Sequence, residues 1–155
     1  MSLHQEIERR YLVRRLPESL EQYPSAHMEQ AYLCTQPVIR VRKSGENCFL
    51  TVKGQGLLCR EELELPLLGD VYQSLLAKAE GNVIVKDRFR IPWQGRTIEL
   101  DVFAPPLAPL VIAEVEFPTE GEAMAFQPPD WFGEEVTCNP AYTNAALSRG
   151  EIPMR

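Results

Sequence analysis

Hydrophobic and polar residues alternate along most of the chain, as in the stretch Val38-Ile39-Arg40-Val41-Arg42. Alternation with a period of two is typical of β-strands that bury one face. The pattern predicts eight strands, at residues 5–13, 27–34, 37–43, 47–53, 59–65, 83–91, 96–103 and 110–117. Sheet structure therefore dominates the predicted fold.

Helical signals interrupt the strands only at a few places. Between the fifth and sixth strands, residues 69–81 have helical spacing, and Asp70 and Gly81 are suited to begin and end a helix there. A short helix is predicted at 119–126, where Thr119 and Glu122 match a capping box.

A last helix is predicted from Asn139 to Gly150, because Asn139 can cap it and Pro140 suits its first position. Together the elements predict an α+β fold with a large antiparallel sheet and a few peripheral helices.

Nearly every predicted strand has one apolar face and one face of ionisable residues. On the first strand, Glu6, Glu8 and Arg10 share a face opposite Tyr11, and Arg9 is expected to reach solvent. The same alternation aligns Arg40, Arg42, Thr51, Lys53, Glu62, Glu64, Lys86, Arg88, Glu99, Asp101, Glu114 and Glu116 on the charged faces of later strands.

Two arrangements explain such a sheet. In an open sheet, helices cover the apolar face and the charged face is solvated. In a closed eight-stranded barrel, the charged face lines the interior and no sheet edge stays exposed. The charged residues are mainly carboxylates and arginines segregated by strand. This favours the barrel, because arginine suits bidentate contact with phosphate or carboxylate.

Length and composition limit the remaining choices. The 155 residues suffice for a single domain, 1–155. No apolar run approaches the roughly 18 residues of a membrane span, and no signal-peptide core begins the chain, so we expect a cytoplasmic protein without membrane association. The net charge of −6 argues against nucleic-acid binding.

Charges confined in a barrel require partners. The carboxylates of the first, seventh and eighth strands suit a hard divalent cation such as Mg²⁺ or Mn²⁺. The cationic residues of the third, fourth and sixth strands suit a polyanion. A metal-bound phosphate chain satisfies both, and this predicts phosphoryl-transfer chemistry.

The order of these charged pairs resembles the CYTH superfamily, the triphosphate tunnel metalloenzymes, along essentially the whole chain. The matching motifs are Glu6-x-Glu8-x-Arg10, Tyr32-Leu33, Arg40-x-Arg42, Thr51-x-Lys53, Glu62-x-Glu64, Lys86-x-Arg88, Glu99-x-Asp101 and Glu114-Val115-Glu116. The chain's length and its C-terminal segment are similar to the compact bacterial branch, whose studied members hydrolyse inorganic triphosphate.

The resemblance implies an eight-stranded antiparallel tunnel with roles for individual residues. The implied metal ligands are Glu6, Glu8, Glu114 and Glu116, supported by Glu62, Glu64 and Asp101. The implied phosphate-binding residues are Arg10, Arg40, Arg42, Lys53, Lys86 and Arg88. Lys53, next to Tyr32, is the implied activator of water, provided that neighbouring arginines and desolvation lower its pKa. Arg10 replaces the usual lysine of the family and can bind phosphate but cannot act as a base.

Three functions follow as hypotheses. The first is a metal-dependent hydrolase of triphosphate, most simply inorganic triphosphate. The second is a class IV-type adenylate cyclase, for which no adenine pocket is identifiable in the sequence. The third is a non-catalytic module that binds polyphosphate or nucleotide. A homodimer is a further hypothesis, since dimers are common among members of the superfamily.

Overall fold

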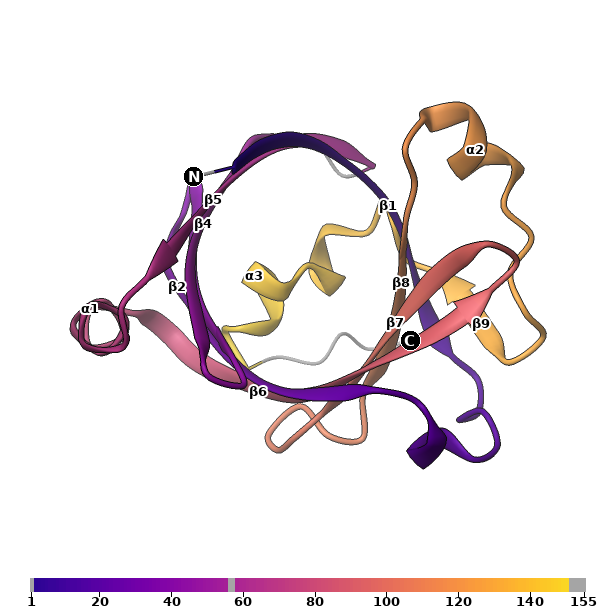
Figure 1. Cartoon of the computed structure of the whole chain (residues 1–155), viewed down its shortest axis with the longest axis horizontal. Helices are drawn as coiled ribbons and strands as arrows, with labels where there is room; N and C mark the ends of the chain where they lie inside the picture. Colours follow the sequence, from indigo (N-terminus) through magenta and orange to yellow (C-terminus); the bar gives the residue numbers. More distant parts are fainter. Residues whose placement is uncertain (1, 56–57, 151–155) are drawn as a thin grey trace.

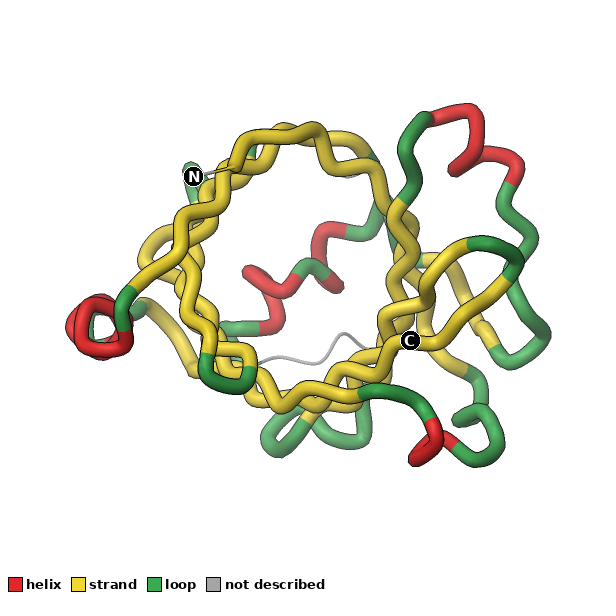
Figure 2. Tube along the Cα trace, viewed as in Figure 1, coloured by secondary structure: helices red, strands yellow, loops and turns green. Residues whose placement is uncertain are grey.

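The computed structural model of the chain describes residues 2–55 and 58–150. Eight long strands form a closed ring when the molecule is viewed as in Figure 1, and Figure 2 shows how little helix there is around them. The strands are β1 Ser2–Val13, β2 Ser25–Thr35, β3 Val38–Ser44, β4 Asn47–Lys53, β5 Cys59–Leu67, β6 Glu80–Trp93, β7 Arg96–Phe103 and β8 Val111–Glu116. The predicted α+β barrel is confirmed, and all eight strands lie where the alternation placed them.

Closure of the barrel depends on β1, which pairs with two strands far away in the sequence. The strand order is β5-β4-β3-β2-β6-β7-β8-β1, and β1 also pairs antiparallel with β5. Its first half lies beside β5, with Glu6 opposite Arg60, and its second half lies beside β8, with Arg10 opposite Glu114. A ninth strand, β9 (Phe132–Glu135), adds to β1 and was not predicted.

The apolar faces of the strands pack outward, so much of the hydrophobic core lies outside the barrel wall. Tyr11 of β1 packs with Phe126, Trp131 and Phe132 of the chain that follows β8. On the opposite side of the ring, α1 (Gly69–Leu76) buries Tyr72 against β2, β3 and β4. Burial of the outward faces against these segments turns the charged faces inward.

The Arg9 prediction was wrong. Arg9 shares the outward face with Tyr11, but its guanidinium donates to both carboxylate oxygens of Glu135 on β9, at 2.8 and 2.6 Å, and to the carbonyl of Ala123. The unpredicted strand β9 supplies this partner, so Arg9 is largely covered and only 17% of its side chain stays exposed.

The α2 helix and α1 differ in how well their ends were predicted. Thr119 caps α2 (Glu120–Ala125) by accepting from the backbone N–H of Glu122, as expected. In α1, Leu68 occupies the N-cap and Asp70 lies in the first turn, where its carboxylate accepts from Val71. The helix ends at Leu76, so the prediction that Asp70 and Gly81 bound it was wrong.

Gly81 belongs to β6 and serves a different purpose. Its φ of +71° favours glycine, and a Cβ there would lie 2.8 Å from the carbonyl oxygen of Ser148. The next residue, Asn82, donates its backbone N–H to that same oxygen. Gly81 therefore lets the C-terminal segment approach the barrel closely.

That C-terminal segment lies within the ring in Figure 1. The predicted helix from Asn139 to Gly150 is divided into a 3-10 turn, η2 (Pro140–Tyr142), and a short helix, α3 (Asn144–Leu147), because Thr143 between them is extended. Asn139 caps the first piece as predicted. Tyr142 and Leu147 are buried against inward-facing barrel residues such as Leu12 and Ile84, so the segment fills one end of the barrel.

In the described part of the chain, every helix is too short or too polar to cross a membrane.

Candidate active site

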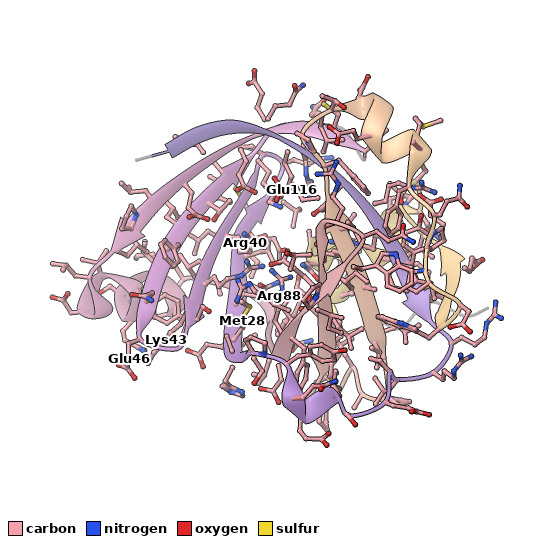
Figure 3. All side chains as sticks on the ribbon, turned by 45° about the vertical axis from the view of Figure 1, so that its right-hand side comes forward. Met28, Arg40, Lys43, Glu46, Arg88 and Glu116 are labelled. Atoms are coloured by element: carbon pink, nitrogen blue, oxygen red, sulfur yellow. The ribbon has the colours of Figure 1, made fainter. Side chains whose placement is uncertain are left out.

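A cavity of about 270 Å³ occupies the barrel interior, and most of the predicted site residues line it. They are Glu6, Glu8, Arg10, Arg40, Arg42, Lys53, Glu62, Glu64, Arg88, Glu114 and Glu116. Three predicted residues, Tyr32, Lys86 and Asp101, do not line it. Figure 3 shows Arg40 and Arg88 within the barrel, whereas Lys43 and Glu46 lie at the end of the β3–β4 hairpin.

One wall of the cavity brings carboxylates together. Burial raises the pKa of Glu8 to about 8, and the nearby charges of Glu114 and Glu6 add to that effect. Burial would also raise the pKa of Glu114, but the guanidinium groups of Arg10 and Arg88 hold it well below its usual range. Of these two carboxyls, Glu8 is thus the one whose charged form its surroundings disfavour.

Arg10 belongs to this carboxylate wall. Its guanidinium lies 3.0 Å from Glu114 and 3.8 Å from Glu8, and it also donates to the backbone carbonyl of Tyr142. The arginine that replaces the expected lysine therefore joins β1 and β8 to the C-terminal segment.

Lys53 is held by carboxylates on two neighbouring strands. Its Nζ lies 3.0 and 3.2 Å from the two oxygens of Glu6 and 3.3 Å from Glu62. Burial would raise the pKa of Glu6, but Lys53, with Arg60, lowers it to about 2. Arg60 lies 3.4 Å from the same Glu6 carboxylate, and Arg40 acts on Glu62, so the nearest partners of Lys53 are carboxylates with arginines behind them.

Tyr32, the expected neighbour of Lys53, lies deeper. It is buried with Leu12, Ile84 and Tyr142 at the end that the C-terminal segment fills. In the described ranges 2–55 and 58–150, no hydrogen bond joins Tyr32 to Lys53.

Lys86, Arg88 and Asp101 form a buried ion-pair network under the cavity. Asp101 accepts from Lys86 at 2.6 Å and from Arg88 at 2.7 and 2.9 Å. Burial lowers the pKa of Lys86 to about 7 despite the attraction of Asp101, with Arg88 and Arg42 adding repulsion. The side chains of Lys86 and Asp101 are fully buried, and their roles in binding phosphate and metal stay predictions.

Arg40 and Arg42 of β3 differ from all other predicted cations of the site. Arg40 donates to the hydroxyl of Thr51 at 3.4 Å, and Arg42 donates to the side-chain carbonyl of Gln30 at 2.7 Å. Neither forms an ion pair with any carboxylate of the described chain. Burial lowers the pKa of Arg42 to about 9, helped by repulsion from Arg40 and Arg88. Among the described residues this pair is therefore a positive centre without an ion-pair partner, although Asp101 attracts Arg42 and Arg40 acts on Glu62 from further away.

Some residues of the site were not predicted. Asn144 lines the cavity, and Gln30 lies behind Arg42. Thr51, which the alternation placed on a charged face, also lines the cavity. Gln30 could have been noticed, because the alternation puts it on the same strand face as Tyr32, but a search for charged residues passes over an amide. Asn144 reaches the cavity only because α3 folds into the barrel, and nothing local in the sequence indicates that.

No family model matches the chain. An inorganic triphosphatase of Nitrosomonas europaea is 40% identical over 148 residues, which are 92% of this chain and 96% of the relative. The chain belongs to the CYTH family of triphosphate tunnel metalloenzymes. The predicted family is thereby confirmed, and membership of it implies a divalent metal.

Two further CYTH comparisons agree. An inorganic triphosphatase of Acetivibrio thermocellus is 40% identical over 112 residues, 70% of each chain. A crystal structure of an inorganic triphosphatase superimposes with a TM-score of 0.71 at 37% identity, covering 96% of this chain and 97% of the other. The CYTH tunnel fold therefore extends over nearly the whole chain.

Proposed function

We propose that this CYTH protein hydrolyses inorganic triphosphate to pyrophosphate and phosphate, and that Mg²⁺ or Mn²⁺ is its metal. The relatives named above support the reaction. The single observation that carries it is the positive centre of Arg40 and Arg42, which lacks a carboxylate partner in the described chain and faces a cavity. Guanidinium groups without a carboxylate partner are suited to bind phosphate oxygens.

The residues on the carboxylate wall fit a hard divalent cation. Their donors are carboxylate oxygens, which Mg²⁺ and Mn²⁺ prefer. Burial first, and then the charges of Glu114 and Glu6, raise the pKa of Glu8, and a dication among these carboxylates would favour its charged form. Among the described residues no three acidic, histidine or cysteine side chains form a ready-made metal cluster, and Glu6 pairs with Lys53 instead.

We assign metal binding to Glu6, Glu8, Glu114 and Glu116, all of which line the cavity. When bound, the metal neutralises charge on the phosphate chain. The protein's own contribution is to hold the phosphate chain with Arg40 and Arg42 and to keep Lys53 fixed between Glu6 and Glu62. Whether Lys53 takes a proton from water stays a prediction, and so does a homodimer.

The test is a substrate panel. Phosphate release from inorganic triphosphate, ATP and thiamine triphosphate is measured with Mg²⁺, with Mn²⁺ and with EDTA, and cyclic AMP is assayed in the ATP reactions. We expect metal-dependent hydrolysis, fastest with inorganic triphosphate. Absence of metal-stimulated release from all three compounds would refute the proposal, and formation of cyclic AMP with pyrophosphate would favour the cyclase.

A further inference from the structure

Gln30 is a fully buried amide immediately behind one of the two arginines of the positive centre. It lies on β2 directly opposite Arg42 of β3 in the antiparallel register. Its Oε1 accepts from Nε of Arg42 at 2.7 Å. Arg42 lines the cavity and Gln30 does not, so Gln30 contacts the arginine from the side away from a ligand.

This contact fixes how Arg42 faces the cavity. A guanidinium is a planar fork whose N–H groups point in set directions. Because Gln30 takes the Nε–H, the two Nη groups remain, and in residues 2–55 and 58–150 no hydrogen bond from either of them is found. The free part of the fork is thus available to phosphate oxygens.

Arg88 shows what a charged partner does in the same barrel. Its Nε donates to Asp101 at 2.7 Å, the same distance as between Arg42 and Gln30. Arg88 also donates a second hydrogen bond to Asp101 at 2.9 Å, whereas Arg42 makes a single contact to Gln30, and the acceptor of Arg88 is a carboxylate while that of Arg42 is neutral. Asp101 pairs directly with Arg88, whereas Arg42 has no carboxylate at ion-pair distance among the described residues and remains available to a ligand.

We propose that Gln30 is a positioning residue for triphosphate binding, which orients Arg42 toward the tunnel without neutralising it. The inference rests on the proposed triphosphatase function and adds a residue that acts through Arg42.

The neutral amide has a cost for the fold. Nε2 of Gln30 is buried without a hydrogen-bond partner in the described chain, and Arg42 lies buried among like charges, which lowers its pKa. A glutamate at position 30 would remove the unpaired donor and supply a counterion. The amide therefore lowers the stability of the fold but leaves the positive charge of Arg42 available to a ligand, an arrangement that is common at functional sites.

The proposal predicts that binding and stability change in opposite directions in Gln30→Glu. We expect its Kd for inorganic triphosphate, measured by calorimetry in EDTA, and its KM with metal to rise about 10- to 100-fold, because a contact to a charged group is lost. Its Tm should equal or exceed that of the wild type.

Two further variants complete the test. Gln30→Met keeps the volume but loses the acceptor, and its Kd should rise only about 3- to 10-fold, with a lower Tm. Gln73→Glu adds the same charge at an exposed position of α1 and should match the wild type in binding and Tm.

Wild-type affinity in Gln30→Glu, with hydrolysis by the wild type intact, would overturn the Gln30 proposal alone. Parallel losses of affinity and Tm in both Gln30 variants would reduce Gln30 to a structural residue and overturn it too. A wild type that neither binds nor hydrolyses triphosphate would instead overturn the proposed function, and the role of Gln30 with it.

Discussion

Lys53 Nζ lies 3.0 Å from Glu6 Oε1, so the expected catalytic lysine and an expected metal ligand form one buried ion pair. The two residues come from β4 and β1, which are separated by β5 in the barrel. Glu62 of β5 completes the contact at 3.3 Å. A change at Lys53 therefore also alters the carboxylates around it, and experiments on Lys53 need a variant that keeps the charge.

Lys53→Ala and Lys53→Arg distinguish a role of Lys53 as a base from a role of its positive charge. If Lys53 is the base, kcat for triphosphate falls about 100-fold or more in both variants, because arginine keeps the ion pairs but cannot accept a proton. KM should change little in Lys53→Arg. Steady-state kinetics measures this, and wild-type kcat in Lys53→Arg would show that Lys53 acts only through its charge.

Arg42→Ala and Arg40→Ala test the positive centre. Each should raise KM for triphosphate by about 10- to 100-fold, since each removes one charge-assisted contact to phosphate. Arg15→Ala is the control, because Arg15 is exposed and pairs only with Asp130 among the described residues. An unchanged KM in both tunnel variants would contradict the role assigned to Arg40 and Arg42.

Asp101→Asn tests whether the network under the cavity is structural. Loss of the carboxylate leaves Lys86 and Arg88 buried without their main counterion, so we expect the free energy of unfolding to fall by about 3–5 kcal/mol. Urea denaturation followed by circular dichroism measures it. Asp130→Asn, which removes an exposed pair with Arg15, should cost less than about 1 kcal/mol. Equal effects of the two substitutions would contradict the prediction.

Glu135→Gln tests the contact that covers Arg9. Hydrogen bonds from Arg9 and then Thr137 lower the pKa of Glu135 below its usual 4.5. A lowered pKa in the folded state stabilises the fold above the unfolded pKa, and this stabilisation is lost as the pH falls through the folded value.

The wild type should therefore be more stable than Glu135→Gln near pH 7, and the difference should vanish in acid, below the folded pKa of Glu135. Thermal unfolding of both proteins from pH 7 to pH 3 measures this. A difference that stays constant over the whole range would show that the charge of Glu135 is not responsible.

The sequence by itself determined the strands, their two faces and the family. Alternation with period two is a local property of each strand, so it can be read without knowing which strand lies next to which. It placed Glu6, Glu8 and Arg10 on one face, and the structure has all three in the cavity lining. The cap at Thr119 was equally readable, because a capping side chain and the backbone N–H that donates to it lie within one turn.

Local signals failed where a distant segment decides the outcome. Asp70 and Gly81 have the right residue types for helix ends, but β6 begins at Glu80 and Gly81 is used for the approach of Ser148. Arg9 was assigned to solvent because nothing near it in sequence indicates its partner, Glu135, which lies 126 residues away.

Only the tertiary structure decided which cations of the tunnel are free to bind an anion. Lys53, Lys86 and Arg88 match the family pattern as well as Arg40 and Arg42 do, and Arg10 keeps the positive charge of the family's lysine. Yet these first three and Arg10 are compensated by carboxylates from other strands. Ion pairing acts over a few ångströms between side chains that closure of the barrel brings together. The strand sequences specify the charges, and the pairing of the strands determines which of them remain uncompensated.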